Sequence, residues 1–455
     1  MRIVAYRRIA LCGMLCYWVV IFWVAISMGR NWPIKETVPL LHRQSQAKQL
    51  VDRRDPPDSH QMTIVRSEML NEKTYVRPEH NPNVTQRTKE AKPEHVRSAT
   101  PRVWPNPKFP DDDRILAQMK YVPESLQAVN ASQVPRDKRI LIHRAYGPLA
   151  MTFQTRTFAD LHCPVSRCII VKDPDRFDTA DVVIFEQNAI APEQIKPAHQ
   201  IWLMYLLEPP PFTGIKSFKN LINWTATYRS DSTIVTPYEK FVPFATPVKK
   251  IQKKNYAAGK TKKVAWFVSN CFSENNRFGV ATELAKYITV DIFGDCGSKS
   301  CPRSKEADCF QMLSRDYKFY LAFENSNCVH YVTEKLFRNG LQNDVIPVVM
   351  GARSEDYKRV SPPHSYIHVE DFETLKDLAK YLHLLDLNDD LYNAYFRWQG
   401  TGEFVNTQFW CRLCALAHDS DHPPSHYEDI QEWWGGKGSC IGMQMWRDVY
   451  KVKRQ

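Results

Sequence analysis

The chain has 455 residues, which is enough for two or three domains of ordinary size. Hydrophobic residues make up 43% of it, and this apolar content excludes a wholly disordered protein because sizeable cores can form. The formal net charge of +11 favours anionic partners, and nucleic acid, anionic lipid and phosphorylated small molecules all fit the charge alone.

Near the N-terminus, Ile9 to Met28 form a run of twenty residues without a charge. A helix rises about 1.5 Å per residue, so this run is long enough to span the ~30 Å hydrocarbon core of a bilayer. A cleaved signal peptide is the alternative, but the run exceeds the roughly 7–15 apolar residues of such peptides, and no A-x-A cleavage site follows it. We therefore predict a cytoplasmic tail (1–8), a transmembrane signal anchor (9–28) and a lumenal remainder, a location that excludes nucleic acid as the partner.

Residues 29–130 are predicted to form a disordered stem. Twelve of the thirty prolines lie between Pro33 and Pro123, and no helical or strand period persists there, so little apolar surface can be buried. The lumen is oxidising, and the ten cysteines outside the apolar run are an even number, as disulfides require. Three N-x-S/T triplets predict glycosylation at Asn83, Asn130 and Asn223.

After the stem, short apolar runs alternate with helical stretches, which predicts parallel α/β sheets. Two domains are expected, residues 131–250 and 251–455, with a basic linker at about Pro247–Lys263. The predicted strands are Arg139–His143, Asp181–Glu186, Gln200–Leu206, Lys263–Ser269, Val290–Phe293, Lys318–Glu324, Val345–Met350 and Tyr366–Val369. The predicted helices are Phe278–Tyr287, one from about Thr333, and Leu375–Leu385.

Lys335 falls where a helix is predicted to begin, a position at which the helix dipole disfavours a cation. The preceding loop follows a strand, so Lys335 should lie at the carboxyl edge of the sheet, where ligands bind. A bound phosphate would offset the dipole, and an ordinary solvated lysine is the alternative. The chain has only sixteen glycines and neither G-x-G-x-x-G nor G-x-x-x-x-G-K-[ST], so a nucleotide's phosphates would need side-chain cations, for which Arg277 is a second candidate.

The segment YKFYLAFENSNCVHYVTEKLFRNGLQNDVIPVVMGA (Tyr317–Ala352) resembles the signature of the α1,3-fucosyltransferases, glycosyltransferase family 10. The segments LINWTATYRSDSTIVTPY (Leu221–Tyr238) and VAWFVSN (Val264–Asn270) resemble further parts of the family pattern, and the resemblance covers roughly Arg139–Cys440. It implies a GT-B fold, in which two Rossmann-like domains face a cleft. The N-terminal domain would bind the acceptor and the C-terminal one GDP-fucose, and the last segment would return to the N-terminal domain. The anchor and stem match the family's single-pass type II layout in the Golgi membrane.

The same resemblance implies roles for particular residues. The residues expected to contact GDP-fucose are Arg277, Asn325, Tyr331, Glu334 and Lys335, with Ser269 and Asn270 near the phosphates. An inverting transfer needs one carboxylate to take the proton of the acceptor hydroxyl. The family base lies in an E-S-P motif after a strand, which places it at Glu208 in LLEPPPFTG, with proline where the family has serine. A turn carboxylate without catalytic function is the alternative for Glu208.

The segment GTGEFVNTQFWCRLCALAH (Gly400–His418) is most similar to invertebrate core α1,3-fucosyltransferases, which act on the Asn-linked N-acetylglucosamine of N-glycans. Two other functions stay open. One is Lewis-type fucosylation of outer N-acetyllactosamine, and the other is a non-catalytic glycan-binding protein of the Golgi membrane, for which the proline after Glu208 is the only support.

Metal sites are not expected. Asp173 and Asp175 have the D-x-D form of Mn²⁺-binding transferases, but the family does not rely on such a motif, so no metal is required and stimulation by Mn²⁺ or Mg²⁺ stays open. Cys411-x-x-Cys414, followed by His418 and His422, has zinc as one interpretation. The resemblance instead suggests disulfides from Cys411 and Cys414 to the region of Cys163 and Cys168, and leaves the pairing of the other cysteines open.

Overall fold

The computed structural model describes residues 102–106, 108, 113–127, 135–143, 149, 158–246 and 254–452. The predicted signal anchor, most of the predicted stem with Asn83 and Asn130, and the first part of the predicted linker lie outside these residues. Within the described ranges, no helix is both long and apolar enough to cross a bilayer.

Part of the predicted stem is folded. The short helix α4 (Ile115–Met119) buries Ile115 and Gln118, and the Gln118 amide donates hydrogen bonds to the carbonyl oxygens of Val103 (2.8 Å) and Thr233 (3.0 Å). A second short helix, α5 (Glu124–Gln127), follows. These helices lie within the predicted stem, and the Gln118–Thr233 hydrogen bond joins them to a residue 115 positions further along the chain, which the local proline-rich composition does not reveal.

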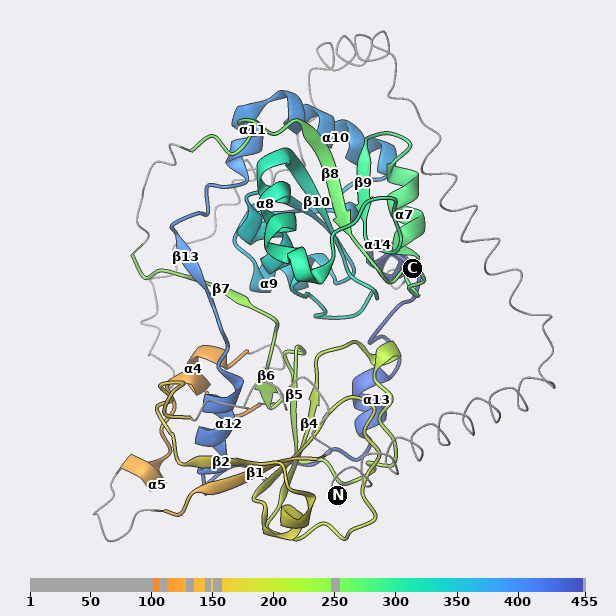
Figure 1. Ribbon diagram of the computed structural model, residues 1–455. Helices are drawn as coiled ribbons and strands as arrows, with labels where there is room; N and C mark the ends of the chain where they lie inside the picture. Colours follow the sequence, from red (N-terminus) through yellow and green to blue (C-terminus); the bar gives the residue numbers. More distant parts are fainter. Residues whose placement is uncertain are drawn as a thin grey trace, which may run out of the picture. The chain divides into compact units, whose positions relative to one another are not determined.

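Six of the described strands form a first parallel sheet, in the order β2-β1-β3-β4-β5-β6 (Figure 1). They are β1 (Lys138–Ile142), β2 (Cys168–Val171), β3 (Val182–Phe185), β4 (Ile201–Leu206), β5 (Trp224–Thr227) and β6 (Ile234–Val235). All four residues of β3, an apolar run, are buried, and so are all four of β5, which includes two threonines, as expected for a sheet covered on both faces. The predicted strands at 139–143, 181–186 and 200–206 correspond to β1, β3 and β4.

Five described strands form a second parallel sheet, in the order β12-β11-β10-β8-β9. They are β8 (Lys262–Phe267), β9 (Val290–Phe293), β10 (Tyr317–Phe323), β11 (Ile346–Met350) and β12 (Ile367–His368). All five were predicted from the sequence within one or two residues. The central strand β10 is buried along its whole length.

Helices connect the strands of the second sheet and continue to the C-terminus (Figure 1). Their bounds are α7 (Arg277–Leu284), α8 (Glu306–Asp316), α9 (Ser354–Val360), α10 (Leu375–Leu387), α11 (Asp389–Ala394), α12 (Phe409–Ala417), α13 (Ile430–Gly435) and α14 (Trp446–Val452). Short 3₁₀ segments are η2 (Pro174–Thr179), η3 (Pro210–Phe212), η4 (Arg303–Lys305), η6 (Leu341–Asn343) and η7 (Val369–Asp371), and η5 (Lys335–Gly340) is a π-helix.

Each sheet has a switch point, at which the connections that follow two neighbouring strands run in opposite directions along the sheet. In the first sheet this point lies between β1 and β3, and in the second sheet between β8 and β10. Ligands of open parallel sheets bind at the carboxyl ends of the strands beside such a point. Ligand-binding residues are therefore expected directly after β8 and β10, and after β1 and β3 in the first sheet.

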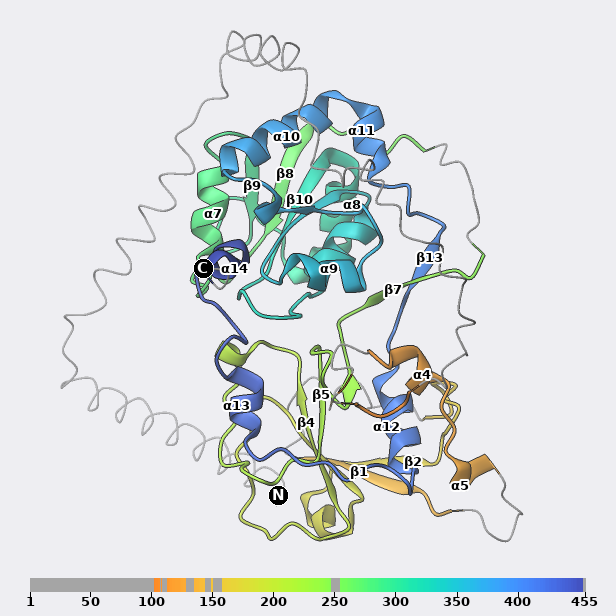
Figure 2. The same cartoon turned by 180° about the vertical axis from the view of Figure 1, so that it is seen from behind.

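The C-terminal part of the chain returns to the first sheet. The antiparallel pair β7 (Lys240–Pro243) and β13 (Gly402–Val405) links the two regions, and α12 then packs into the core that contains β1, β3 and β4 (Figure 2). Two disulfides, Cys163–Cys411 and Cys168–Cys414, fix α12 there, which confirms the pairing region expected for these cysteines. Three further disulfides join Cys271–Cys296, Cys301–Cys309 and Cys328–Cys440.

Asn223, the described member of the three predicted glycosylation triplets, is engaged in the fold. Its side-chain oxygen accepts hydrogen bonds from the Trp202 backbone N–H (3.0 Å) and from the Lys196 ammonium, and its Nδ2 donates to the Ser425 carbonyl (3.2 Å). Thr225 is fully buried, with its hydroxyl 2.9 Å from that of Tyr427. A glycan would replace one of the two Nδ2 hydrogens and would have to share this nitrogen with the contact to the Ser425 carbonyl.

We therefore expect Asn223 to be unmodified in the folded protein, which peptide mass spectrometry of the chain from eukaryotic cells would check. Asn223→Gln should leave the glycan mass unchanged but lower the free energy of unfolding by about 1–3 kcal/mol, because the Trp202 backbone N–H and the Lys196 ammonium lose their partly buried acceptor. A folded chain that carries a glycan at this position would contradict the assignment.

Candidate functional site

Arg277, the first residue of α7, holds the switch point of the second sheet together. Its guanidinium donates hydrogen bonds to the carbonyl oxygens of Phe323 at the end of β10 (2.9 Å) and of Asn270 after β8 (3.1 Å). The side chain is buried, and burial lowers the pKa of the guanidinium. A buried cation at the carboxyl ends of two adjacent strands favours an anionic ligand at this place.

Several polar atoms around Arg277 have no hydrogen-bond partner within the described part of the chain. They are the Nε of Arg277, the Oδ1 of Asn325 and the Oγ of Ser326, all of them buried. Buried polar groups without partners are rare in folded proteins, and a group of them at a switch point is typical of a site that binds a polar ligand. Asn325 belongs to this group, and its contact with a donor stays a prediction; Ser326 was not among the predicted residues.

Lys335 lies beside this group but is already paired. Its ammonium is 3.1 Å from the Oε2 of Glu324 and 3.2 Å from the Oε1 of Glu334. Burial alone would lower the pKa of Lys335, but the two carboxylates raise it well above its usual value. Burial likewise raises the pKa of Glu324, whereas for Glu334 the Lys335 charge outweighs burial and the pKa is lowered.

The expected α-helix from Thr333 is not present in that form. The chain from Lys335 to Gly340 is a single π-helical segment, too short to develop much of a dipole, so the dipole is a weak reason for the position of Lys335. The reason is the buried carboxylate of Glu324, directly after β10. Glu324 was not among the predicted site residues, although a carboxylate directly after a buried strand was a usable signal.

Ser269 and Asn270 follow β8 and are exposed. They lie at the carboxyl edge of the second sheet, as predicted, but only the backbone carbonyl of Asn270 contacts Arg277. The neighbouring disulfide Cys271–Cys296 fixes the loop that carries them. Among the described residues, no hydrogen bond or ion pair joins either side chain to Lys335, and their predicted place near the phosphates stays a prediction.

Glu208 lies two residues after β4 and is followed by the η3 turn. The Tyr331 hydroxyl, from the loop after β10, is 3.4 Å from the Oε2 of Glu208. Burial raises the pKa of Tyr331 well above its usual value, and the charges of Glu324 and Glu208 add to this effect. The structure thus brings the predicted base of the first sheet close to the loop that carries Asn325 and Lys335.

Two more tyrosines surround Glu208. The ring of Tyr228 is 5.1 Å from that of Tyr331, and the Tyr238 hydroxyl donates a hydrogen bond to the Leu207 carbonyl (3.1 Å). Burial raises the pKa of Tyr238, and the negative charges of Glu208 and Glu334 contribute to the increase. Carboxylates from both sheets therefore face the same group of aromatic residues.

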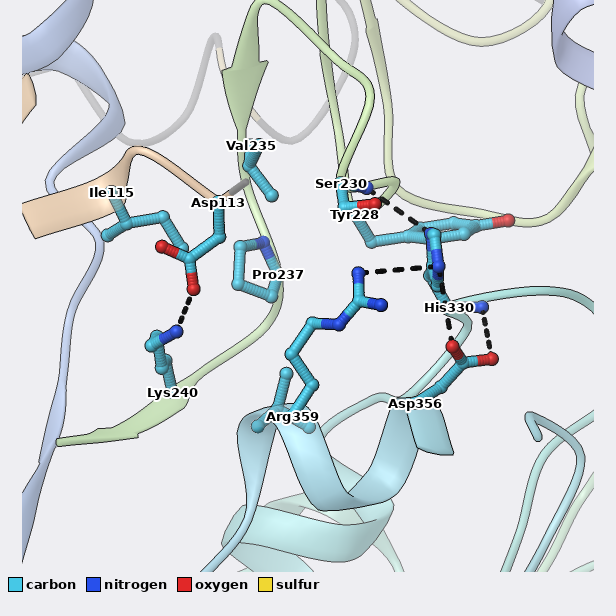
Figure 3. A pocket seen from close by; sticks show the side chains of 11 residues that line it. Asp113, Ile115, Tyr228, Ser230, Val235, Pro237, Lys240, His330, Asp356 and Arg359 are labelled. Carbon is cyan, nitrogen blue, oxygen red and sulfur yellow. Dashed lines mark hydrogen bonds and ion pairs between the residues drawn. The ribbon is translucent and has the colours of Figure 1, made fainter. Parts of the chain in front are cut away.

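His330, one residue before Tyr331, lines a cavity of about 20 Å³, which has room for about one water molecule and is too small for a sugar (Figure 3). Its Nδ1 accepts a hydrogen bond from the Ser230 backbone N–H (3.3 Å), and its Nε2 is 3.3 Å from the Oδ1 of Asp356. Arg353 and Arg359 also approach the Nε2. His330 therefore joins the first sheet, through Ser230, to α9 of the second.

Two predicted alternatives for metal binding have structural explanations. Asp173 caps the η2 segment by accepting the Asp175 backbone N–H (3.0 Å), so this D-x-D pair stabilises a turn. Cys168, Cys414 and His418 form a group with metal-ligand spacing, but the two cysteines are joined in a disulfide and their sulfurs are not thiolates. Zinc is therefore not a fit for the oxidised site.

The fold and the site are those of a two-sheet α/β transferase. Two parallel sheets are present, with the cations Arg277 and Lys335 at the switch point of the second and the Glu208 carboxylate after β4 of the first. Residues 257–433 match the family model described as glycosyltransferase family 10 (fucosyltransferase) C-term, and residues 135–239 match the fucosyltransferase N-terminal model. Over 359 residues the chain is 45% identical to glycoprotein 3-alpha-L-fucosyltransferase A of Drosophila melanogaster, which covers 78% of this chain and 70% of the relative. The chain therefore belongs to glycosyltransferase family 10 and is an α1,3-fucosyltransferase.

Other relatives agree with this assignment. Alpha-(1,3)-fucosyltransferase C of Drosophila melanogaster is 38% identical over 306 residues, which covers 60% of this chain and 71% of the relative. A crystal structure of an alpha1,3-fucosyltransferase with GDP aligns with a TM-score of 0.44 and 17% identity, over 68% of this chain and 98% of that chain. The fold assignment does not depend on this superposition and rests on the strand order of the two sheets. An enzymatic function sets aside the alternative of a non-catalytic glycan-binding protein.

The buried histidine predicts a pH-dependent stability. Burial lowers the pKa of His330 to about 4, whereas an unfolded histidine has a pKa of about 6.5. The neutral ring therefore stabilises the fold fully above pH 6.5, and this contribution is lost as the pH falls toward 4. We expect the free energy of unfolding to decrease by about 2 kcal/mol between pH 7 and pH 5 because of His330.

Urea unfolding at the two pH values measures this change. His330→Asn should be less stable at pH 7 and show a smaller decrease between pH 7 and pH 5. Substitution of the exposed His426 by Asn is the matched control. An equal decrease in the wild type and in His330→Asn would show that other groups cause the acid sensitivity.

Proposed function

We propose that the protein transfers L-fucose from GDP-fucose, with inversion, in α1,3 linkage to the Asn-linked core N-acetylglucosamine of N-glycans. The observation that carries this proposal is the proximity of Glu208 to the loop of Asn325, Tyr331 and Lys335, through the 3.4 Å contact of Tyr331. The name of the Drosophila relative, a glycoprotein 3-alpha-L-fucosyltransferase, supports the acceptor class. A solved alpha1,3-fucosyltransferase is described with GDP-fucose, which agrees with the donor.

The second sheet would bind the donor in a GT-B arrangement. Lys335 and Arg277 would neutralise the diphosphate, because no glycine-rich backbone cradle is present in the sequence. Asn325 and Ser326 offer the unpartnered polar atoms, and Glu334, whose side chain is 45% exposed, can reach hydroxyls of fucose or ribose. The two cations supply the charge stabilisation that a divalent metal gives other transferases, so no metal is required in this proposal.

The first sheet would supply the base. The oxygen of the acceptor hydroxyl attacks the anomeric carbon of fucose while Glu208 takes its proton, and the bond from that carbon to the phosphate oxygen breaks. GDP leaves with the bonding electrons, which Lys335 and Arg277 stabilise. A single displacement of this kind inverts the anomeric carbon and needs no covalent intermediate. The η3 turn, with Pro209 and Pro210 after Glu208, limits the backbone freedom at the base.

The proposal includes the cellular location. The predicted signal anchor at 9–28 would hold the enzyme as a single-pass type II protein of the Golgi membrane, with the catalytic part in the lumen. The five disulfides of the described chain agree with an oxidising compartment.

The acceptor and the base can be tested together. The full-length chain should add one fucose to the Asn-linked N-acetylglucosamine of a defined glycopeptide, and mass spectrometry with fragmentation would locate it. Glu208→Gln should lower kcat by about 10²–10⁴-fold, because the general base is lost while the donor contacts remain. Glu193→Gln is the control, because it makes the same carboxylate-to-carboxamide change at an exposed residue and should leave kcat unchanged.

Two outcomes would contradict the proposal. Fucose found only on outer N-acetyllactosamine would favour the Lewis-type alternative. Unchanged kcat in Glu208→Gln would exclude this carboxylate as the base.

Lys335→Met should weaken GDP binding by about 10- to 100-fold, since one charge-assisted contact to the diphosphate is removed. Isothermal titration calorimetry with EDTA in the buffer measures this change and also shows whether binding requires a metal. Lys286→Met, at an exposed lysine that pairs with Glu283 on α7, is the matched control. Equal affinities for GDP in the wild type and in Lys335→Met would exclude Lys335 from the donor site.

A further inference from the structure

Glu324 occupies a position at which both the backbone and the side chain are held. Its backbone N–H donates to the Met350 carbonyl (2.9 Å), and its carbonyl accepts from the Asn275 side chain (2.9 Å). A Cβ at Gly351 would come within 2.6 Å of the Glu324 Cβ, so the residue directly after β11 has to be glycine for Glu324 to fit. Glu324 has no exposed surface.

The Glu324 carboxylate is the end of a short hydrogen-bonded chain that leads to Lys335. The Thr333 backbone N–H donates to its Oε1 (2.8 Å), and the Thr333 hydroxyl lies 2.9 Å from its Oε2. The Lys335 ammonium donates to the same hydroxyl (2.8 Å) and pairs with the Oε2 at 3.1 Å. Because every member of this chain is fixed by another, the ammonium has one defined position.

The two carboxylates that pair with Lys335 differ in mobility. The Glu324 side chain is fully buried, whereas that of Glu334 is 45% exposed and can turn toward a ligand. We propose that Glu324 is a positioning residue, which holds the Lys335 ammonium toward the donor diphosphate. When the donor binds, Glu334 gives up its ion pair with Lys335 and accepts a hydrogen bond from a sugar hydroxyl instead. This inference rests on the proposed donor function. It assigns to Glu324 a role through Lys335 and no contact with the substrate.

The charge of Glu324 also explains how two cations share one switch point. Without it, the buried Lys335 would face the Arg277 guanidinium from α7, and both burial and this like charge disfavour the ammonium. The titratable groups that face Lys335 are Glu324 after β10, Glu334 on its own segment, Arg277 on α7 and Tyr320 on β10. Glu324 and Glu334 are the two among them that stabilise the ammonium.

A double-mutant cycle tests the role. Glu324→Gln keeps the shape of the side chain and an acceptor for Thr333 but removes the charge. We expect it to weaken GDP binding about tenfold at pH 7 and more at pH 8.5, because the Lys335 pKa falls toward the assay range. In the Lys335→Met background the same change should alter the dissociation constant by less than about twofold at either pH.

Controls and a second variant keep the result interpretable. Glu283→Gln, at a carboxylate on α7 that pairs with Lys286, should not alter GDP binding. Should Glu324→Gln fail to fold, Thr333→Val removes the hydroxyl between Glu324 and Lys335, and its effect should likewise vanish in the Lys335→Met background. Glu324→Asp keeps the charge but shortens the side chain. Its affinity for GDP should lie between those of the wild type and Glu324→Gln and should depend less on pH than that of Glu324→Gln.

The outcomes separate this inference from the proposed function. Equal losses of affinity in the wild-type and Lys335→Met backgrounds, without a pH effect, would overturn the positioning role and leave the donor assignment intact. A wild-type chain that does not bind GDP would overturn both.

Discussion

The ion pair between Lys335 and Glu324 is the contact on which the arrangement of charges at the switch point of the second sheet depends. An ammonium removed from water is stable only beside an opposite charge with good geometry, and a buried carboxylate has the same requirement. The strand order brings β8 and β10 together, so the pair forms next to Arg277, at the place where a parallel sheet binds ligands. The cluster of the Glu324 carboxylate with the Lys335 and Arg277 cations is therefore a property of the fold itself and does not require a bound nucleotide.

The loop from Asn325 to Tyr331 transmits this arrangement to the first sheet. Cys328 joins Cys440, and Tyr331 extends from the loop to Glu208. His330 between them contacts Ser230, which follows β5 of the first sheet, and Asp356 on α9, which follows β11 of the second. A loop held at three points has little conformational freedom left to lose when a substrate binds, which lowers the entropic cost of binding.

The sequence predicted much of this architecture, and the limits have physical causes. Three described strands of the first sheet, all five of the second and the cysteines of α12 could be found because apolar runs and a specific motif carry local information, whereas β2, β5 and β6 were missed. The roles of Arg277, Asn325 and Lys335 at a donor site stay predictions. The π-helix at Lys335 was expected as an α-helix, since the periodicity of six residues cannot distinguish them. The folded part of the stem and the contacts of His330 were missed because their partners lie about a hundred residues away. Asp173 shows the reverse case, in which a short motif with a catalytic appearance is a turn cap.

The path of the C-terminal segment restricts how chimaeras between this enzyme and its relatives can be built. The chain leaves the second sheet, adds α12 and α13 to the cores of the first, and comes back to place Trp446, which donates a hydrogen bond to the Gly351 carbonyl (2.8 Å). Neither half is a continuous piece of polypeptide. Chimaeras that exchange acceptor-binding halves between relatives would therefore have to replace two separated stretches of sequence and the disulfide partners on both of them, and a single crossover at the linker would leave each core incomplete.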